Sequence, residues 1–134
     1  MASKQTVLNV EGAVGSLIYR LESISSAVNE FHVQHKVDCP AIKDLGGKLA
    51  ALKNSLGEIP ELSHGHQSCQ GTYHPLVERL ERWMVCCRLL VGKVEDEISR
   101  LGLGRVDEKG LRVDRNMLEQ QKQALVFLLT ACNA

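Results

Sequence analysis

The sequence predicts an all-α protein, a single antiparallel four-helix bundle that spans residues 1–134. Apolar residues recur alternately three and four positions apart in four segments, which is the spacing of a helix with one buried face. No segment shows the apolar-polar alternation of a half-buried strand. Polar stretches that contain glycine or proline separate the segments, so the helices are expected to run up, down, up and down.

The first helix is predicted over residues 4–34, where the apolar spacing continues for more than three heptads. The positions that share this face are Val7, Val10, Val14, Leu17, Leu21, Ile24, Val28 and Phe31. An alternation of this length is typical of the seam of a helix packed in a bundle. The stretch from Lys36 to Pro40 then interrupts it.

The second helix is predicted over residues 40–59. Asp38 or Cys39 is placed to cap it, and a proline is acceptable in the first turn because its missing amide hydrogen would be unpaired there. The inward positions are Ile42, Leu45, Leu49, Leu52, Leu56 and Ile59. Gly46 and Gly47 lie inside the helix, where glycine either weakens it or marks the close approach of another backbone.

The third helix is predicted over residues 74–101, after the longest polar loop, residues 61–74. Its inward positions are Leu76, Leu80, Trp83, Cys87, Leu90, Val94, Ile98 and Leu101. Gly102 and Gly104 follow, and glycine ends helices because it adopts the left-handed conformation without penalty. The length of the loop also permits the chain to cross the bundle between the second and third helices.

The fourth helix is predicted over residues 114–133, with Asp114 as its N-cap. The expected inward positions are Met117 or Leu118, Gln121, Leu125, Leu128 and Cys132. The last turns are apolar nearly all round, so one inward face does not account for all of their apolar residues.

The end of this helix is therefore the predicted interaction surface. Val126, Phe127 and Leu129 would lie outside the inward stripe and need cover from elsewhere in the chain or from another chain. We expect them to form or border a surface for self-association or for a protein partner, flanked by Trp83 and Leu90 of the third helix.

Composition and charge narrow the classes of function. The 16 basic and 16 acidic residues balance, which argues against an electrostatically driven nucleic-acid binder. The longest uncharged apolar run, residues 124–134, is shorter than the roughly 20 residues that a membrane-spanning helix needs. Membrane contact is left open but not favoured. Five cysteines with no C-x-x-C pair indicate a reducing, cytoplasmic environment.

A candidate metal site lies in and next to the polar loop. His64, His66, Cys69 and His74 bring imidazole and thiol groups, which suit zinc or copper, into one short stretch. The four residues match neither structural zinc spacing nor a helical H-E-x-x-H motif. We therefore expect no metal and no cofactor, and this site stays the weaker alternative.

Catalytic groups are not predicted. Cys87 is expected inward, where a free thiol acts as a small apolar side chain, and a nucleophilic Cys86 or Cys87 would need a histidine base nearby. Asp96 and Glu97 are expected on a charged, solvated face, since the E-x-x-H motif of carboxylate-bridged di-iron bundles is missing. The sequence contains no catalytic constellation, so the protein is not expected to be an enzyme.

The last helix resembles a known family. Its residues 118–133, LEQQKQALVFLLTACN, resemble the closing helix of the fungal N-terminal (HeLo-like) helical domains that precede STAND or NLR-like modules and ankyrin arrays. In that family a polar Gln/Lys-rich turn runs into an Ala-Leu-x-x-Leu-Leu core. The remainder of the chain agrees in architecture alone, and its first helix carries Asn9, Glu11 and Arg20 where the family has a longer apolar helix. The resemblance implies a domain that acts by protein association and sometimes by membrane damage.

The leading hypothesis is a non-enzymatic helical adaptor or signalling domain that acts by protein–protein association. One alternative is a membrane-active cell-death domain, which requires a continuous charge-free apolar face on the first helix. The other is a small helical enzyme or metal-binding protein that uses the His/Cys stretch 64–74. The charges of the first helix lie outside its seam, which is typical of a bundle helix and favours the adaptor.

Overall fold

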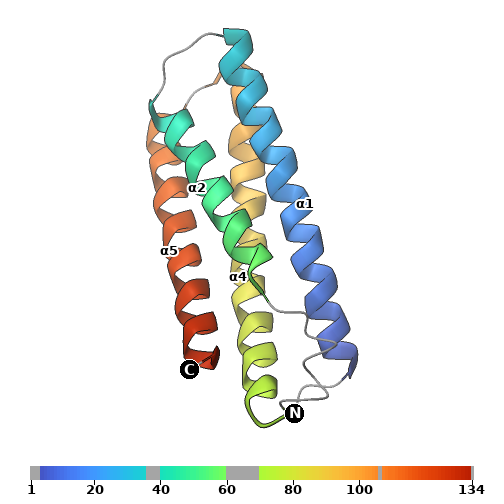
Figure 1. The fold of residues 1–134 in the computed structure, drawn as a ribbon. Coiled ribbons are helices and arrows are strands. Elements are labelled where there is room, and N and C mark those ends of the chain that lie inside the picture. The colour runs from blue at the N-terminus through green and yellow to red at the C-terminus, as the bar shows by residue number, and fades with distance from the viewer. Residues whose placement is uncertain (1–3, 36–39, 60–69, 106, 134) are drawn as a thin grey trace.

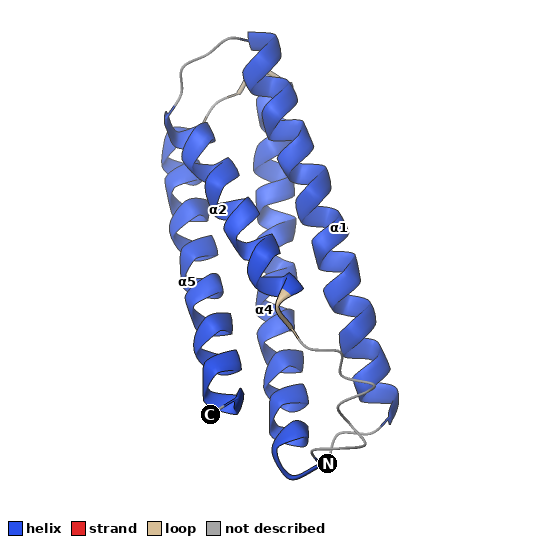
Figure 2. Ribbon diagram, viewed as in Figure 1, coloured by secondary structure: helices blue, strands red, loops and turns tan. Residues whose placement is uncertain are grey.

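The all-α bundle is confirmed in a computed structural model, which describes residues 4–35, 40–59, 70–105 and 107–133. Every regular element in these ranges is a helix (Figures 1 and 2). The four helices are α1 (Lys4–His35), α2 (Pro40–Gly57), α4 (Gln70–Gly102) and α5 (Glu108–Asn133).

The helices alternate in direction along the chain, but their neighbours are not all antiparallel. In the described part of the chain α1 and α5 each pack against α2 and α4, while the backbones of α1 and α5, like those of α2 and α4, lie diagonally opposite and do not approach closely. Figure 1 shows α1 and α4 rising and α2 and α5 descending. The pairs α1/α2 and α4/α5 are therefore antiparallel, as expected, whereas α1/α4 and α2/α5 are parallel.

Side-chain contacts confirm these directions. Between α2 and α5, Asp44 pairs with Arg115 and Lys48 with Glu119, so residue numbers rise together along a parallel pair. Between α4 and α5, Trp83 contacts Gln121 and Lys93 contacts Asp114, so the numbers run in opposite senses. The helix that follows α2 in the chain, α4, lies diagonally opposite it. The connection between them therefore crosses the bundle, as the length of the second loop permitted.

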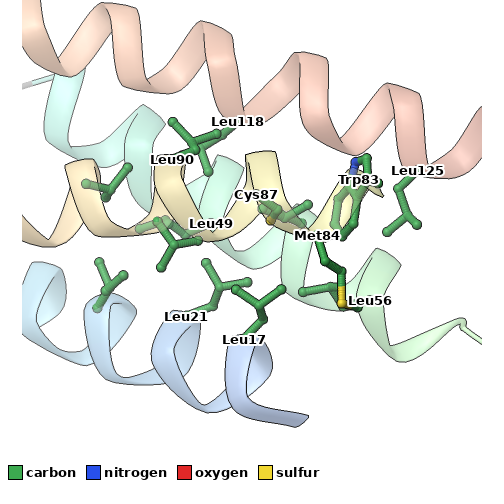
Figure 3. Close-up of a cluster of buried hydrophobic side chains, with 14 of the residues drawn as sticks. Leu17, Leu21, Leu49, Leu56, Trp83, Met84, Cys87, Leu90, Leu118 and Leu125 are labelled. Atoms are coloured by element: carbon green, nitrogen blue, oxygen red, sulfur yellow. The ribbon is translucent and has the colours of Figure 1, made fainter. Parts of the chain in front are cut away.

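One hydrophobic cluster fills the space between the four helices (Figure 3). The predicted inward positions of the first three helices are buried or partly buried wherever their side chains are described. The largest fully buried side chains are Leu17, Leu21, Ile42, Leu45, Leu49, Leu52, Leu56, Leu80, Met84, Leu101 and Leu111. Removal of this apolar surface from water is the main source of the bundle's stability.

The helix ends correct two predictions. α5 begins at Glu108, six residues before the predicted start, because Asp107 is the N-cap: its Oδ1 accepts a hydrogen bond from the Gly110 amide at 3.0 Å. Asp114 is therefore inside the helix and caps nothing. α4 begins at Gln70, four residues early, because apolar spacing marks only the buried turns and the first described core residue of α4 is Leu76.

The other ends lie close to the expected positions. α2 ends at Gly57, two residues before the prediction, and its predicted caps lie outside the described residues. α4 ends as the glycines predicted: Gly104 has φ +80°, and the Arg105 and Gly104 amides donate hydrogen bonds to the carbonyl oxygens of Arg100 and Leu101. This arrangement satisfies carbonyl groups that the last turn of a helix leaves unpaired.

Candidate interaction face

A second row of three-four spaced residues runs along the solvent side of α5. We call it the outer stripe; its members are Val113, Met117, Gln120, Ala124, Phe127 and Ala131. All six are exposed, and Phe127 keeps 76% of its surface in contact with solvent. The spacing puts them on one narrow face of the helix, in the pattern of a packing seam rather than of a solvated surface. Five of the six side chains are apolar, so α5 carries a bundle-type seam that nothing in the described chain covers.

The inner face of α5 confirms two of the predicted inward residues, Leu118 and Leu125, and differs in the others. Leu111, Leu118, Leu125 and Leu129 are buried. The expectation that Leu129 lies outside the inward stripe, at an interface, is wrong: it is 7% exposed and belongs to the core. The predicted inward stripe included Leu128, which is only partly buried. Each residue step rotates a helix by about 100°, so Leu129 lies on a different side of the helix from Leu128.

The remaining predicted interface residues divide between two sides of α5. Phe127 lies on the outer stripe, as expected for an interface residue. Val126 is 40% exposed, but the helical rotation places it on the side nearer α2, beside the inner face. Cys132 has a side chain outside the described residues. Exposure alone is confirmed for Val126 and Phe127, and their role in an interface stays a prediction.

The flanking residues predicted on the third helix are not available for binding. Trp83 and Leu90 are both buried in the core, and the Trp83 indole N–H donates a hydrogen bond to the Gln121 carbonyl oxygen at 3.0 Å. The contacts Trp83–Gln121 and Lys93–Asp114 place the middle of α4 level with the first half of α5. At that level the exposed apolar residue of α4 is Leu89, near the height of Met117.

Buried polar groups lie between α4 and α5. Asp114 is completely buried, and its Oδ1 accepts a hydrogen bond from the Lys93 ammonium group at 2.7 Å, while its Oδ2 is buried and has no partner among the described residues. Lys93 itself is exposed, so its ammonium group reaches from the surface to a buried carboxylate. Such a contact favours one register of the two helices, because a slip would leave the buried carboxylate without its counter-charge. We assign Asp114 this structural role.

Glu97 corrects the expectation of a fully solvated acidic face. Asp96 is exposed, but Glu97 is buried because it points at Gly110 of α5. A Cβ atom at Gly110 would lie 2.9 Å from Glu97 Oε1 and 2.7 Å from Asp107 Oδ2, so a side chain there would displace the ends of these two carboxylates. Arg100 Nη1 lies 3.4 Å from the same Glu97 oxygen and compensates its charge.

The adjacent cysteines of α4 face opposite ways. Cys87 is buried, as predicted, and Cys86 is exposed. Burial raises the pKa of the Cys87 thiol from 9.0 to about 12, an effect that the nearby Arg20 charge only partly opposes. Cys87 is therefore protonated at neutral pH and acts as a small apolar side chain rather than as a nucleophile.

Besides Asp44–Arg115, two further ion pairs join the parallel helix pairs. Arg20 of α1 donates to Glu95 of α4 through Nε at 3.2 Å and Nη2 at 2.5 Å, and this hydrogen bond raises the pKa of Arg20. Lys48 of α2 donates to Glu119 of α5 at 3.0 Å, and this bond, with a second from Gln123, lowers the pKa of Glu119. Both pairs are partly exposed, so we regard them as surface links between helices.

The candidate metal side chains all fall outside the described part of the chain. His64, His66 and Cys69 lie outside the described residues, and His74 lies in α4 with a side chain that is not described. Among the described residues no group of three or more His, Cys, Asp or Glu side chains is arranged to hold a metal ion. The metal alternative stays untested.

A half-open groove of about 420 Å³ lies between α1 and α2. Gly46 and Gly47 line it together with Ser25, Asn29 and Ala50. A Cβ atom at Gly46 would make an ordinary 3.6 Å contact with Val28, and one at Gly47 would meet nothing within 4 Å. The two glycines therefore widen the groove and are not required by a close approach of another backbone.

Comparison with protein-family models, with curated proteins and with solved structures gave no match for this chain. In the described part of the chain no helix is both long enough and apolar enough to cross a bilayer.

Proposed function

We propose that this protein is a helical association module that binds a partner helix along the outer stripe of α5. The observation that carries the proposal is the stripe itself, whose exposed residues have the same three-four spacing as the bundle core. Soluble proteins have many scattered exposed apolar residues, but a periodic row of them along one helix is typical of a contact surface.

The chemistry of the stripe indicates what kind of partner it accepts. It has no charged side chain, its largest residue is an aromatic ring, and Gln120 near its middle offers both a hydrogen-bond donor and an acceptor. A partner helix with its own apolar row would bury Met117 and Phe127, and aromatic and methionine side chains are enriched in the cores of interfaces. A charged partner such as nucleic acid finds no matching charge on this face.

This proposal agrees with the adaptor function implied by the resemblance of residues 118–133 to HeLo-like domains, and that resemblance stays an expectation. The rigid support of the stripe favours binding without rearrangement. The inner face of α5 is anchored by four buried leucines and by the Asp114–Lys93 pair, so the outer side chains are held on a fixed helix.

The proposal is tested by affinity capture of the tagged protein from the cells that express it. We expect the wild type to retain a defined set of proteins that the variant Phe127→Glu loses, because a charge in an apolar seam is costly to bury. The matched control is Tyr19→Glu, since Tyr19 on α1 is an aromatic residue with 72% exposure. Circular dichroism must show that both variants are folded. Identical sets of captured proteins from all three forms would contradict the proposal.

A further inference from the structure

Resting on that proposed function, we propose that the partner helix is α5 of a second copy of the chain, docked antiparallel about a two-fold axis. An axis through the outer stripe at the level of residue 122 pairs each member of the stripe with another member. The pairs are Val113 with Ala131, Met117 with Phe127, and Gln120 with Ala124. A two-fold interface uses the same patch on both copies, so the patch must complement itself.

The sizes of the paired side chains complement one another. At both ends of the stripe Val113 faces the smaller Ala131, and near the axis Gln120 faces the smaller Ala124. Between them Met117 meets Phe127, a thioether–aromatic contact that is favourable beyond its apolar area. A large side chain faces a small or flexible one at every level, which is how seams interdigitate. A parallel pairing would instead place the two Phe127 rings and the two alanine positions each against themselves.

Charge favours the same orientation. Every charged residue of α5 lies at or before position 122: Glu108, Lys109, Arg112, Asp114, Arg115, Glu119 and Lys122. Residues 123–133 carry none. A parallel pair would bring the exposed Lys109 of both copies together, and like charges in register destabilise a helix pair. The antiparallel pair places this basic side chain opposite the uncharged last turns.

The extent of the stripe sets the expected strength. From Val113 to Ala131 the helix rises about 27 Å. Each copy would contribute one helix over that length, with the exposed Leu89 of α4 beside it. We expect this contact to bury less surface per partner than a standard interface, which buries about 800 Å². We therefore expect a reversible dimer with a dissociation constant in the micromolar range.

Two measurements test the dimer. Light scattering after size exclusion should give a molar mass that rises from one to two chains as the concentration passes about 10 µM. Phe127→Glu should remain monomeric over the same range, while the matched control Tyr19→Glu dimerises like the wild type. If Phe127→Glu does not fold, Met117→Lys tests the same contact.

Disulfide cross-linking tests the orientation. The exposed Cys86 and the remaining cysteines other than the buried Cys87 are replaced by serine, and Gln120→Cys or Ala124→Cys is then introduced. A disulfide needs Cα atoms within about 7 Å, so the antiparallel pair predicts a cross-link in an equimolar mixture of the two variants but not in either variant alone. A cross-link in Gln120→Cys alone would overturn the antiparallel arrangement.

A wild type that stays monomeric at all concentrations would overturn the proposal that the partner is a second copy. Co-sedimentation of the monomer with phosphatidylserine-containing vesicles would overturn it as well. The proposed function as an association module is contradicted by a different result, in which Phe127→Glu captures the same proteins as the wild type. The two failures are thus distinguishable.

Discussion

The residues of the inner and outer faces of α5 have the same three-four spacing, but the inner residues are buried and the outer ones are exposed. Leu118, Leu125 and Leu129 are buried against α2 and α4, whereas Met117 and Phe127, on the neighbouring face, remain exposed. Local helix geometry treats the two rows alike, since both repeat every three and four residues. The two rows differ because α2 and α4 cover only the inner one. Whether a periodic row is buried therefore depends on the neighbouring helices and not on the helix alone.

The difference between the two faces of α5 can be tested by placing the same charge on each of them. We expect Leu129→Asp to lower the free energy of unfolding by more than about 4 kcal/mol, because it removes a buried leucine and buries a carboxylate without a partner. Phe127→Asp should change the free energy of unfolding of the monomer by less than about 1 kcal/mol. Urea unfolding at low protein concentration measures both. Equal losses would show that the two faces are not distinct.

The ion pair between the buried Asp114 of α5 and the exposed Lys93 of α4 can be broken and then repaired. We expect Lys93→Met to destabilise the protein by about 3 kcal/mol, because it leaves the Asp114 carboxylate buried without a counter-charge. The double variant with Lys93→Met and Asp114→Leu should recover much of this loss, since it no longer buries a carboxylate without a counter-charge. Thermal unfolding of the three proteins provides the values. No recovery in the double variant would indicate that the Asp114 position cannot accept an apolar side chain.

The two cysteines of α4 extend the comparison to a second helix. In a chain whose other cysteines are replaced by serine, Cys86 should react with a thiol reagent at pH 8, and Cys87 only on unfolding. The folded state keeps the Cys87 proton that the unfolded state releases above pH 9.0. Its stabilising effect is therefore full below that pH and is lost as the pH rises toward about 12. Cys87→Ala should show a shallower fall in stability between these pH values, and an unchanged slope would contradict the assignment.

The smallest effect is expected at the edge between the two faces of α5, where Glu119 pairs with Lys48 of α2. Lys48→Met should raise the pKa of Glu119 toward its ordinary value of 4.5, because the main cause of the lowered pKa is removed. The wild-type pair stabilises the fold above the unfolded-state pKa, and this contribution is lost as the pH falls. Side-chain NMR titration of Glu119 measures the change, with Lys53→Met as the control at another exposed pair, that with Glu22.

Much of the fold could be predicted from local spacing. The rows from Val10 to Phe31, from Ile42 to Leu56 and from Leu76 to Leu101 identified the first three helices and their core positions. Gly104 marked the end of α4 because few residues other than glycine adopt its backbone conformation readily. The inward position of Cys87 followed from the same periodicity.

Part of the candidate site was also present in the sequence. The row Val113, Met117, Gln120, Ala124, Phe127 and Ala131 satisfies the three-four rule as well as any core row does. A helix that begins at Asp114 excludes Val113 from this row. Leu128 is then as good a candidate for the inward face as Leu129, so the sequence does not separate the two faces. Recognition of Asp107 as the N-cap, with glycine three residues later, would have exposed the row.

The sequence by itself determined that the chain forms helices and which residues share a face, because both depend on interactions within a few residues of one another. Only the tertiary structure decided that α2 and α4 are diagonal, that Leu129 rather than Leu128 completes the inner face, and that Asp114 and Glu97 are buried. These outcomes depend on which surfaces of different helices fit together. Helical periodicity defines the candidate faces of each helix, but the free energy of packing against specific neighbours selects the one that is buried.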